Sequence, residues 1–318
     1  MSKGLVRAEG LEPPRLSPPE PKSGASTNSA TFATENSPKN NVLYPPGQGA
    51  VSVAHYENFP VASLLLPAPL RRPVEVIYRF ARSADDFADE GFDPSRIRLA
   101  KLSVYRAHLV TIAAGETPQD SQFAELAEVV HAHGLPVPLF QDLLDAFSQD
   151  VTKKRYANYA EVLDYCRRSA NPVGRLLLHL FKHTTDSALR ASDAICTALQ
   201  LINFWQDIDL DYTNDNRVYL PQDEMARFGV SELHLIEKTC DEAWKSLLAF
   251  QVERSRALMM SGAPLGRELP GRIGLEIRAT VQGGLRILEK IEHAAYDVFR
   301  KRPVLRPLDW PALLLKAA

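Results

Sequence analysis

Apolar residues recur every three or four positions from about residue 55 onward, which is the spacing of one face of an α-helix. This spacing predicts helices at 71–90, 93–115, 117–134, 137–151, 159–170, 171–184, 187–211, 231–260 and 264–300. Strict alternation of apolar and polar residues, which would indicate β-strands, is essentially absent. We therefore predict an all-α fold.

The first 50 residues differ in composition from the rest of the chain. They are rich in Pro, Ser, Asn and charged residues, and they lack the apolar run of a signal peptide. Such a segment buries too little apolar surface to offset its ordering entropy. We predict a disordered leader at 1–50, a single helical domain at 55–305 and a short tail at 306–318.

Charge and cysteine content argue against a nucleic-acid-binding, a disulfide-rich or a zinc-binding protein. The net charge of −2 over 318 residues gives no broad basic surface, so we expect no nucleic-acid partner. The three cysteines are far apart and suggest neither a disulfide framework nor a zinc site. No apolar run approaches the roughly 20 residues of a membrane span. We expect a cytoplasmic protein, with peripheral contact to the inner membrane face as an open alternative.

Polar residues form a ladder along one predicted helix that is otherwise apolar nearly all round. Asn203, Asp207 and Asp211 are four residues apart and so share a face of the helix at 187–211. A helix that is apolar on its remaining faces is typically buried. Buried carboxylates need partners or a metal ion, so this ladder indicates a site rather than a solvated surface.

A second ladder lies more than 100 residues earlier, where Asp85 and Asp89 are again four residues apart. All the donors in the two ladders are oxygens, which suit Mg²⁺, an ion that binds through a few carboxylates and substrate phosphates. Arg82 precedes the first ladder and Arg217 follows the second, and arginine binds phosphate oxygens in bidentate fashion. The pattern predicts a Mg²⁺–diphosphate site within a helical bundle, with Mn²⁺ as the alternative ion.

The two ladders are part of longer motifs that resemble the squalene/phytoene synthase family. The segments "YRFARSADDFADE" and "QLINFWQDIDLDYTNDNRVYLP" resemble its two aspartate-rich motifs. "HYENFPVASLLLP" and "RYANYAEVLDYC" resemble two further family segments, and the resemblance spans about residues 55–300. It implies a single-domain helical bundle of the isoprenoid synthase type with a central cavity.

The resemblance also implies roles for individual residues. Metal binding falls to Asp85, Asp89, Asn203, Asp207 and Asp211; substrate binding to His55, Asn58, Arg82, Gln200 and Arg217; and contact near the reacting carbons to Tyr78 and Tyr165. The apolar walls of the bundle would hold the prenyl tails of the substrate.

Two departures from the phytoene and squalene synthase pattern bear on the reaction. Where those enzymes have a small apolar segment, this chain has "RRSANPVG", and Asn58 stands where a serine is usual. Both features resemble the hydroxysqualene synthase branch of the hopanoid pathway, in which water captures the cation formed from presqualene diphosphate. We predict that Asn171, together with Ser169, positions that water. No nicotinamide-binding fingerprint is present, so we expect no NADPH.

Other activities remain open at this point. Within the family, a presqualene diphosphate synthase or a phytoene- or dehydrosqualene-type synthase would need the same ladders and would use allylic prenyl diphosphates. A non-catalytic family member that acts as an assembly or binding protein should lose carboxylates, and here both ladders are complete. A head-to-tail elongase would carry D-D-x-x-D on both sides, and it is disfavoured because the second motif here starts with Asn203 and has a spacing of four. Partner enzymes of the same pathway are not identified by the sequence.

Overall fold

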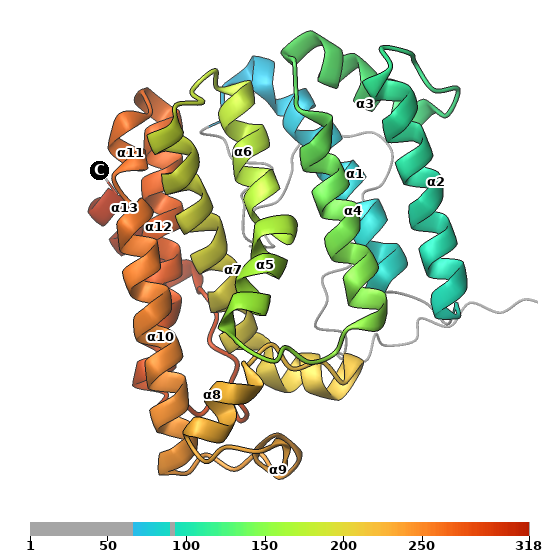
Figure 1. The fold of residues 1–318 in the computed structure, drawn as a ribbon. Coiled ribbons are helices and arrows are strands. Elements are labelled where there is room, and N and C mark those ends of the chain that lie inside the picture. The colour runs from blue at the N-terminus through green and yellow to red at the C-terminus, as the bar shows by residue number, and fades with distance from the viewer. Residues whose placement is uncertain (1–65, 90–92, 318) are drawn as a thin grey trace, which may run out of the picture. The chain divides into compact units, whose positions relative to one another are not determined.

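The computed structural model describes residues 66–89 and 93–317, all within the compact unit Leu43–Ala318 (Figure 1). Its elements are α1 (Ala68–Asp89), α2 (Ser95–Ala113), α3 (Ser121–His133), α4 (Val137–Thr152), α5 (Tyr159–Ser169), α6 (Asn171–Leu180), α7 (Asp186–Asp215), α8 (Gln222–Arg227), α9 (Glu232–Ile236), α10 (Glu242–Gly262), α11 (Leu265–Glu268), α12 (Gly271–His293), the 3₁₀ helix η1 (Pro307–Asp309) and α13 (Trp310–Ala317). The described residues form no strand, which confirms the all-α prediction. None of these helices is both long and apolar enough to cross a bilayer.

Two of the predicted long helices are each divided in the structure. The segment 231–260 forms α9 and α10, because Asp241 caps a new helix by accepting a hydrogen bond from the backbone N of Trp244 at 2.9 Å. Between the two helices, Lys238 adopts a left-handed φ of 53°. The segment 264–300 likewise divides into α11 and α12, with Pro270 at the start of the second helix, and α12 ends at His293 rather than near residue 300.

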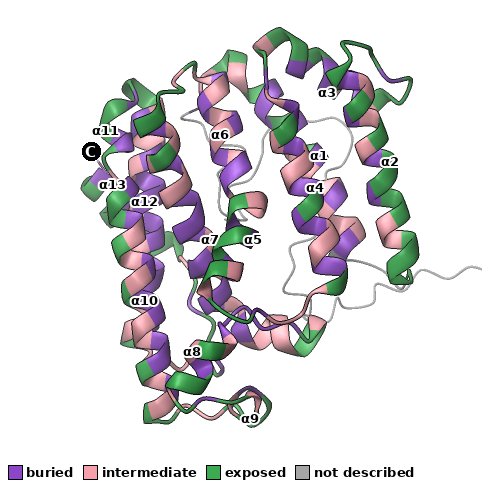
Figure 2. Ribbon diagram, viewed as in Figure 1, coloured by how far each residue is buried: buried purple, intermediate pink, exposed green. Residues whose placement is uncertain are grey.

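Helix α7 is the central element of the larger apolar core. It contacts α5 and α6 on one side and α10 and α12 on the other (Figure 1). Figure 2 shows α7 buried along much of its length, whereas much of α2 is exposed. The indole Nε1 of Trp205, which is fully buried, donates to the Ser255 hydroxyl on α10 at 2.9 Å. A second apolar cluster is built mainly from α1 to α4. The burial predicted for the ladder helix is thus confirmed.

The close approach of α6 to α7 depends on Gly174. A Cβ added at this glycine would lie 2.4 Å from Ser192 Oγ and 2.5 Å from Cys196 Sγ, which are distances that real side chains do not adopt. The missing side chain therefore allows the two helices to meet. This contact places the beginning of α6, where Asn171 lies, beside the first half of α7.

The C-terminal elements are fixed to α12 by a buried carboxylate. Asp309 accepts hydrogen bonds from Lys290 Nζ at 2.6 Å, from Arg286 Nε at 2.9 Å and from the backbone N of Arg306 at 2.7 Å. Burial alone would raise the pKa of Asp309, but these donors hold it well below its usual range. Residues 306–318, expected as a tail, therefore include a segment that packs on the helical domain.

This arrangement predicts a pH-dependent effect of Asp309→Asn. The pKa of Asp309 is lower in the folded than in the unfolded protein, where it is about 3.9. Its stabilising contribution is present above about pH 4 and is lost as the pH falls through the folded-state pKa. We expect the variant to lose about 1–2 kcal/mol of unfolding free energy at pH 7. In urea titrations the difference from the unmodified protein should shrink below pH 4, and a difference independent of pH would contradict the assignment.

Candidate functional site

The polar ladder of α7 lies at the edge of the buried core. Asn203, Asp207 and Asp211 occupy three successive turns of the helix, and all three are half-buried, whereas the intervening Phe204, Trp205 and Ile208 are buried. Their side chains are therefore neither fully buried in the core nor fully exposed to solvent. The ladder is therefore a row of polar groups on a helix that is otherwise held within the core.

Asp207 is bound by an arginine from the C-terminal segment. Arg302 contacts both carboxylate oxygens of Asp207 in a fork, with its Nε on Oδ1 and its Nη2 3.0 Å from Oδ2. Sequence reasoning did not identify Arg302, because 95 positions separate the two residues and the arginine stands in a basic run near a predicted helix end. The contact shows that this carboxylate lies where a cation can bind it.

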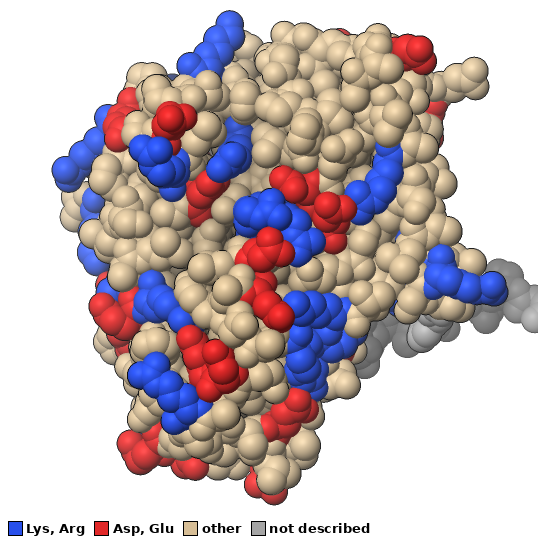
Figure 3. Space-filling view, in the orientation of Figure 1, with Lys and Arg blue, Asp and Glu red and all other residues tan. Residues whose placement is uncertain are grey.

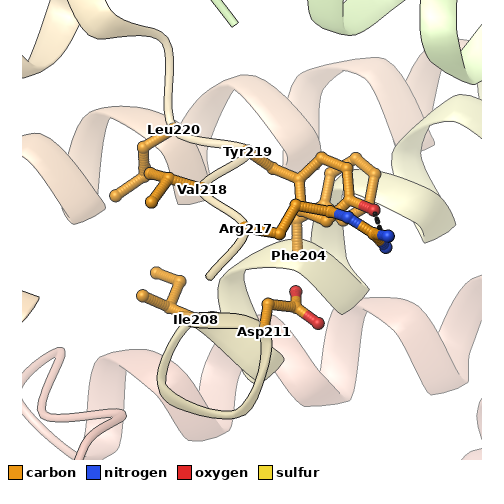
Figure 4. Close-up of a pocket in the computed structure, with 7 residues that line it drawn as sticks. All are labelled: Phe204, Ile208, Asp211, Arg217, Val218, Tyr219 and Leu220. Carbon is orange, nitrogen blue, oxygen red and sulfur yellow. Dashed lines mark hydrogen bonds between the residues drawn. The ribbon is translucent and has the colours of Figure 1, made fainter. Parts of the chain in front are cut away.

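A small pocket opens between the last turns of α7 and the segment 217–220. Its lining consists of Phe204, Ile208, Asp211, Arg217, Val218, Tyr219 and Leu220 (Figure 4). The ring of Tyr219 stacks on Phe204, with 3.6 Å between the ring centroids and 9° between the planes. The guanidinium of Arg217 donates to the Tyr219 hydroxyl at 3.1 Å, and Asp211 projects from α7 into the same space (Figure 4). The predicted residues Asp211 and Arg217 are thus brought together.

Asp150 on α4 holds the buried side of this pocket together. Its Oδ2 accepts a hydrogen bond from the Tyr165 hydroxyl at 2.7 Å, and its Oδ1 lies 3.7 Å from Arg217 Nη1. Arg217 Nη2 also donates to the backbone carbonyl of Asp150 at 3.1 Å. The side chains of Asp150 and Arg217 are only 3% and 4% exposed, so the two charges are almost fully withdrawn from water. A buried ion pair therefore fixes both Arg217 and Tyr165.

The role of Asp150 was not predicted from the sequence, although its position among apolar residues indicates that it is buried. On the helix at 137–151 it falls at helical spacing from Phe140, Leu143 and Phe147, all buried, so it occupies a core position. A single carboxylate on an apolar face needs a cationic partner elsewhere in the fold. The spacing therefore predicts a buried ion pair, but it does not show which arginine is the partner of Asp150.

The tyrosines around Asp150 are held in their neutral form. Burial raises the pKa of Tyr165 and of Tyr219 well above the ordinary value for a phenol, and the negative charge of Asp150 raises each of them further. Tyr165 also lies against Phe204 and Tyr219, with ring centroids 6.0 and 5.6 Å away. The face of a neutral aromatic ring in an apolar environment attracts a nearby cation, and the phenol does not need to ionise for this.

Arg155 fixes the segment that carries Arg217. Its Nε and Nη2 lie 2.6 and 2.9 Å from the two carboxylate oxygens of Glu232, and Nη2 also donates to the Asn216 side chain at 2.8 Å. Asn216 ends α7 in a left-handed conformation, with φ of 49°. A backbone bridge then pairs Arg155 with Val218. The arginine of the "RY" segment thus orders the turn from α7 into the pocket lining.

Buried polar groups lie where α5 passes into α6. Asn171 is 7% exposed, and its Oδ1 accepts a hydrogen bond from Thr197 Oγ1 on α7 at 2.9 Å. The Oγ of Ser169, two residues earlier, is buried, and no residue in the described part of the chain supplies it with a hydrogen-bond partner. Because a buried hydroxyl rarely stays unsatisfied, this position favours a water molecule or a polar ligand group.

The first ladder is described only in part. Arg82 on α1 lies 2.8 Å from Asp86 and 3.7 Å from Asp85, so its guanidinium neutralises the beginning of this ladder. Asp89 is the last residue of α1, and its side chain lies outside the described part. Tyr78 on α1 and Gln200 on α7 are both half-buried.

Two predicted substrate-binding residues, His55 and Asn58, fall outside the described residues altogether.

The donors of α7 fit a magnesium ion in type and number. Within residues 66–89 and 93–317, no three His, Cys, Asp or Glu side chains group together as a metal site. Mg²⁺ seldom uses such a protein cage and binds instead through one or two carboxylates together with waters and substrate phosphates. Asp207 and Asp211 would supply these carboxylates, with Asn203 as a neutral oxygen donor. Arg302 contacts both oxygens of Asp207, so a bound ion would either share this carboxylate with the guanidinium or replace it.

Comparisons with known proteins agree with this arrangement. The profile of the squalene/phytoene synthase family matches residues 53–309. A hydroxysqualene synthase from Rhodopseudomonas palustris is 36% identical over 80% of this chain and 85% of its own. A 15-cis-phytoene synthase from Synechococcus elongatus is 27% identical over 84% of this chain and 91% of its own.

A crystal structure extends the comparison to three dimensions. Squalene synthase HpnC from Alicyclobacillus acidocaldarius superposes with a TM-score of 0.71 and 35% identity, over 76% of this chain and 90% of that one.

Proposed function

The chain belongs to the squalene/phytoene synthase family, and on that premise we propose that it is a Mg²⁺-dependent hydroxysqualene synthase. Members of this family are enzymes that act on prenyl diphosphates. The proposed reaction converts presqualene diphosphate and water into hydroxysqualene and diphosphate, as a step of hopanoid and squalene biosynthesis. It proceeds by loss of diphosphate, rearrangement of the carbocation and capture of water.

The buried polar groups at the beginning of α6 are the observation that favours this reaction over those of the related enzymes. A synthase that ends in a hydrocarbon has no need to hold water beside the cation, whereas one that ends in an alcohol does. Ser169 and Asn171 place a buried hydroxyl and a buried amide within two residues of each other. The greater identity to a hydroxysqualene synthase, at 36%, than to a phytoene synthase, at 27%, supports the same choice.

The residues of the site divide into groups that bind charge and groups that face the carbocation. Bound Mg²⁺ would neutralise the charge that develops on the departing diphosphate. Asn203, Asp207 and Asp211 would hold the ion, with Asp85 and Asp89 proposed to bind a further ion from α1. Arg82, Gln200 and Arg217, with His55 and Asn58, are the proposed diphosphate contacts.

The carbocation would lie against the buried aromatic groups. Tyr165, held by Asp150 and kept neutral, presents its ring to the interior, and we propose the same for Tyr78. The apolar core must exclude bulk water until rearrangement is complete, because early capture would give the wrong alcohol. A single ordered water at Asn171 would then add to one carbon of the rearranged carbocation and give the alcohol.

The proposed role of Asn171 predicts a change of product. Asn171→Ala removes the amide that would hold the quenching water, so the share of eliminated hydrocarbons should rise relative to alcohol in mass spectrometry of the products. Thr197→Val is the companion variant, because it removes the hydrogen bond that orients Asn171 and keeps the amide itself. It should shift the ratio in the same direction by less. A product ratio unchanged in Asn171→Ala would rule out this role.

A product assay tests the proposed activity as a whole. Purified protein with Mg²⁺ and without NADPH receives farnesyl diphosphate or presqualene diphosphate in separate reactions. An alcohol formed only from presqualene diphosphate supports hydroxysqualene synthase. Turnover of farnesyl diphosphate would instead indicate a presqualene diphosphate synthase or a phytoene- or dehydrosqualene-type synthase. Folded protein that converts neither substrate would favour an assembly or binding protein of the same family.

The accompanying proposals follow from this reaction. Mg²⁺ is the proposed ion, with Mn²⁺ as the alternative, and the reaction consumes no NADPH. The substrate is presqualene diphosphate or another prenyl diphosphate, supplied by partner enzymes of the same pathway. We place the protein in the cytoplasm, with peripheral contact to the inner membrane face.

A further inference from the structure

Large apolar side chains are exposed on the C-terminal segment, on the side that faces away from α12. Leu308 in η1 and Leu315 in α13 are 90% and 81% exposed, and Leu314 is 45% exposed. Leu313 and Ala317 of the same helix are buried. The segment therefore has two apolar sides, one that packs on α12 and one that nothing in the described part of the chain covers.

Helical spacing aligns Leu308 and Leu315 along one stripe, with Leu314 at its edge. Leu308 and Leu315 are seven residues apart, which is two turns of helix, and the exposed Pro311 and Ala312 lie between them. Asp309, held by Lys290 and Arg286, anchors the stripe to α12. The stripe is thus presented by a fixed element and not by a loose end.

Basic residues outnumber acidic residues around the stripe. Residues 300–317 contain five basic residues, and Asp309, their one acidic residue, is buried in hydrogen bonds. Arg302 is paired with Asp207, whereas Arg300, Lys301, Arg306 and Lys316 are exposed. Two of these four have a carboxylate beside them, Asp297 at 3.4 Å from Arg300 and Glu289 at 3.8 Å from Lys316. Over the face drawn in Figure 3, by contrast, acidic and basic side chains are interspersed. An apolar stripe whose flanks carry an excess of basic residues complements an anionic lipid surface.

We propose that Leu308, Leu314 and Leu315, with the flanking basic residues, form a docking surface for anionic membranes. The leucines would enter the boundary between headgroups and acyl chains, and Arg300, Lys301, Arg306 and Lys316 would contact lipid phosphates. Prenyl diphosphates, the substrates of this family, carry long apolar tails that partition into membranes, so docking would bring the enzyme to its substrate. The surface itself is inferred from exposure and charge and not from the reaction proposed above.

Vesicle flotation of the full chain tests this surface. Vesicles of phosphatidylethanolamine with phosphatidylglycerol should carry the protein upward in a density gradient, and vesicles of phosphatidylcholine should carry much less. Leu308→Glu/Leu315→Glu should reduce the bound fraction roughly tenfold or more, because it replaces inserted apolar groups with charges that anionic lipid repels. Raising the salt concentration should weaken binding of the unmodified protein.

Val104→Glu/Val110→Glu on α2 is the matched control. These valines are 56% and 62% exposed, so the pair changes the net charge equally and removes exposed apolar surface elsewhere. It should bind vesicles as the unmodified protein does, and both variants should turn over detergent-dispersed substrate normally.

Three results would overturn the proposal: equal flotation of Leu308→Glu/Leu315→Glu and the unmodified protein, loss of flotation in the α2 variant alone, or no flotation of the unmodified protein. A dimer in sedimentation that Leu308→Glu/Leu315→Glu converts to a monomer, with flotation unchanged, would assign the stripe to a second copy of the chain. Because flotation requires no turnover, failure of docking and failure of the proposed reaction are distinguishable.

Discussion

Asp207→Asn should reduce turnover of the diphosphate substrate by roughly 10²–10³-fold or more while leaving the fold intact. The amide keeps the shape of the side chain but removes the charge that would hold Mg²⁺ against the departing diphosphate. Stability should change little, because Asp207 and Arg302 form a partly exposed ion pair, with side chains 22% and 42% exposed. Such pairs contribute about 1 kcal/mol or less. Single-turnover rates and urea unfolding measure the two effects separately.

Asp209→Asn provides a closely matched control for this prediction. Asp209 lies two residues from Asp207 on the same helix, is 20% exposed and also forms an ion pair, with Lys238 at 2.8 Å. It points away from the ladder face, so this variant makes the same chemical change outside the proposed metal site. Near-normal turnover in Asp209→Asn beside a large loss in Asp207→Asn would support the site. Equal losses would point to a general effect of charge on α7, and near-normal activity in Asp207→Asn would remove the central claim.

Asp150→Ala should destabilise the protein by about 3–5 kcal/mol, because it leaves the guanidinium of Arg217 buried without its carboxylate. The variant also removes the acceptor of the Tyr165 hydroxyl. For a domain of this size the midpoint of thermal unfolding should fall by roughly 10 °C. Differential scanning calorimetry of the purified variant provides the measurement.

Asp150→Asn separates the charge of Asp150 from its shape. The amide oxygen can still accept from Tyr165, and the backbone carbonyl still accepts from Arg217. We expect an intermediate loss of stability, together with weaker substrate binding, because Arg217 is then held less firmly. An Asp150→Ala variant as stable as the unmodified protein would show that the pair contributes nothing to the fold. Cys240, which is only partly buried and lies outside this network, offers Cys240→Ser as a neutral comparison.

Local spacing accounts for what the sequence predicted correctly. The helices, the burial of α7 and its ladder of Asn203, Asp207 and Asp211 all follow from residues three and four positions apart. Helix boundaries were predicted less accurately. The segment 231–260 has continuous helical spacing, but the structure divides it at the cap of Asp241 and the left-handed Lys238. Spacing describes one face of a helix, whereas a break depends on a single backbone conformation.

The sequence by itself determined the helical class, the family motifs and the residues proposed to bind metal and diphosphate, because these depend on neighbours along the chain. Only the tertiary structure decided their partners. Arg217 is paired with Asp150 across 67 positions, Arg155 with Glu232 across 77, and Asp207 with Arg302 across 95. Periodicity specifies which side of a helix is buried but not which helix faces it. Charges from distant segments meet only when the apolar faces have packed, and packing is a property of the whole chain.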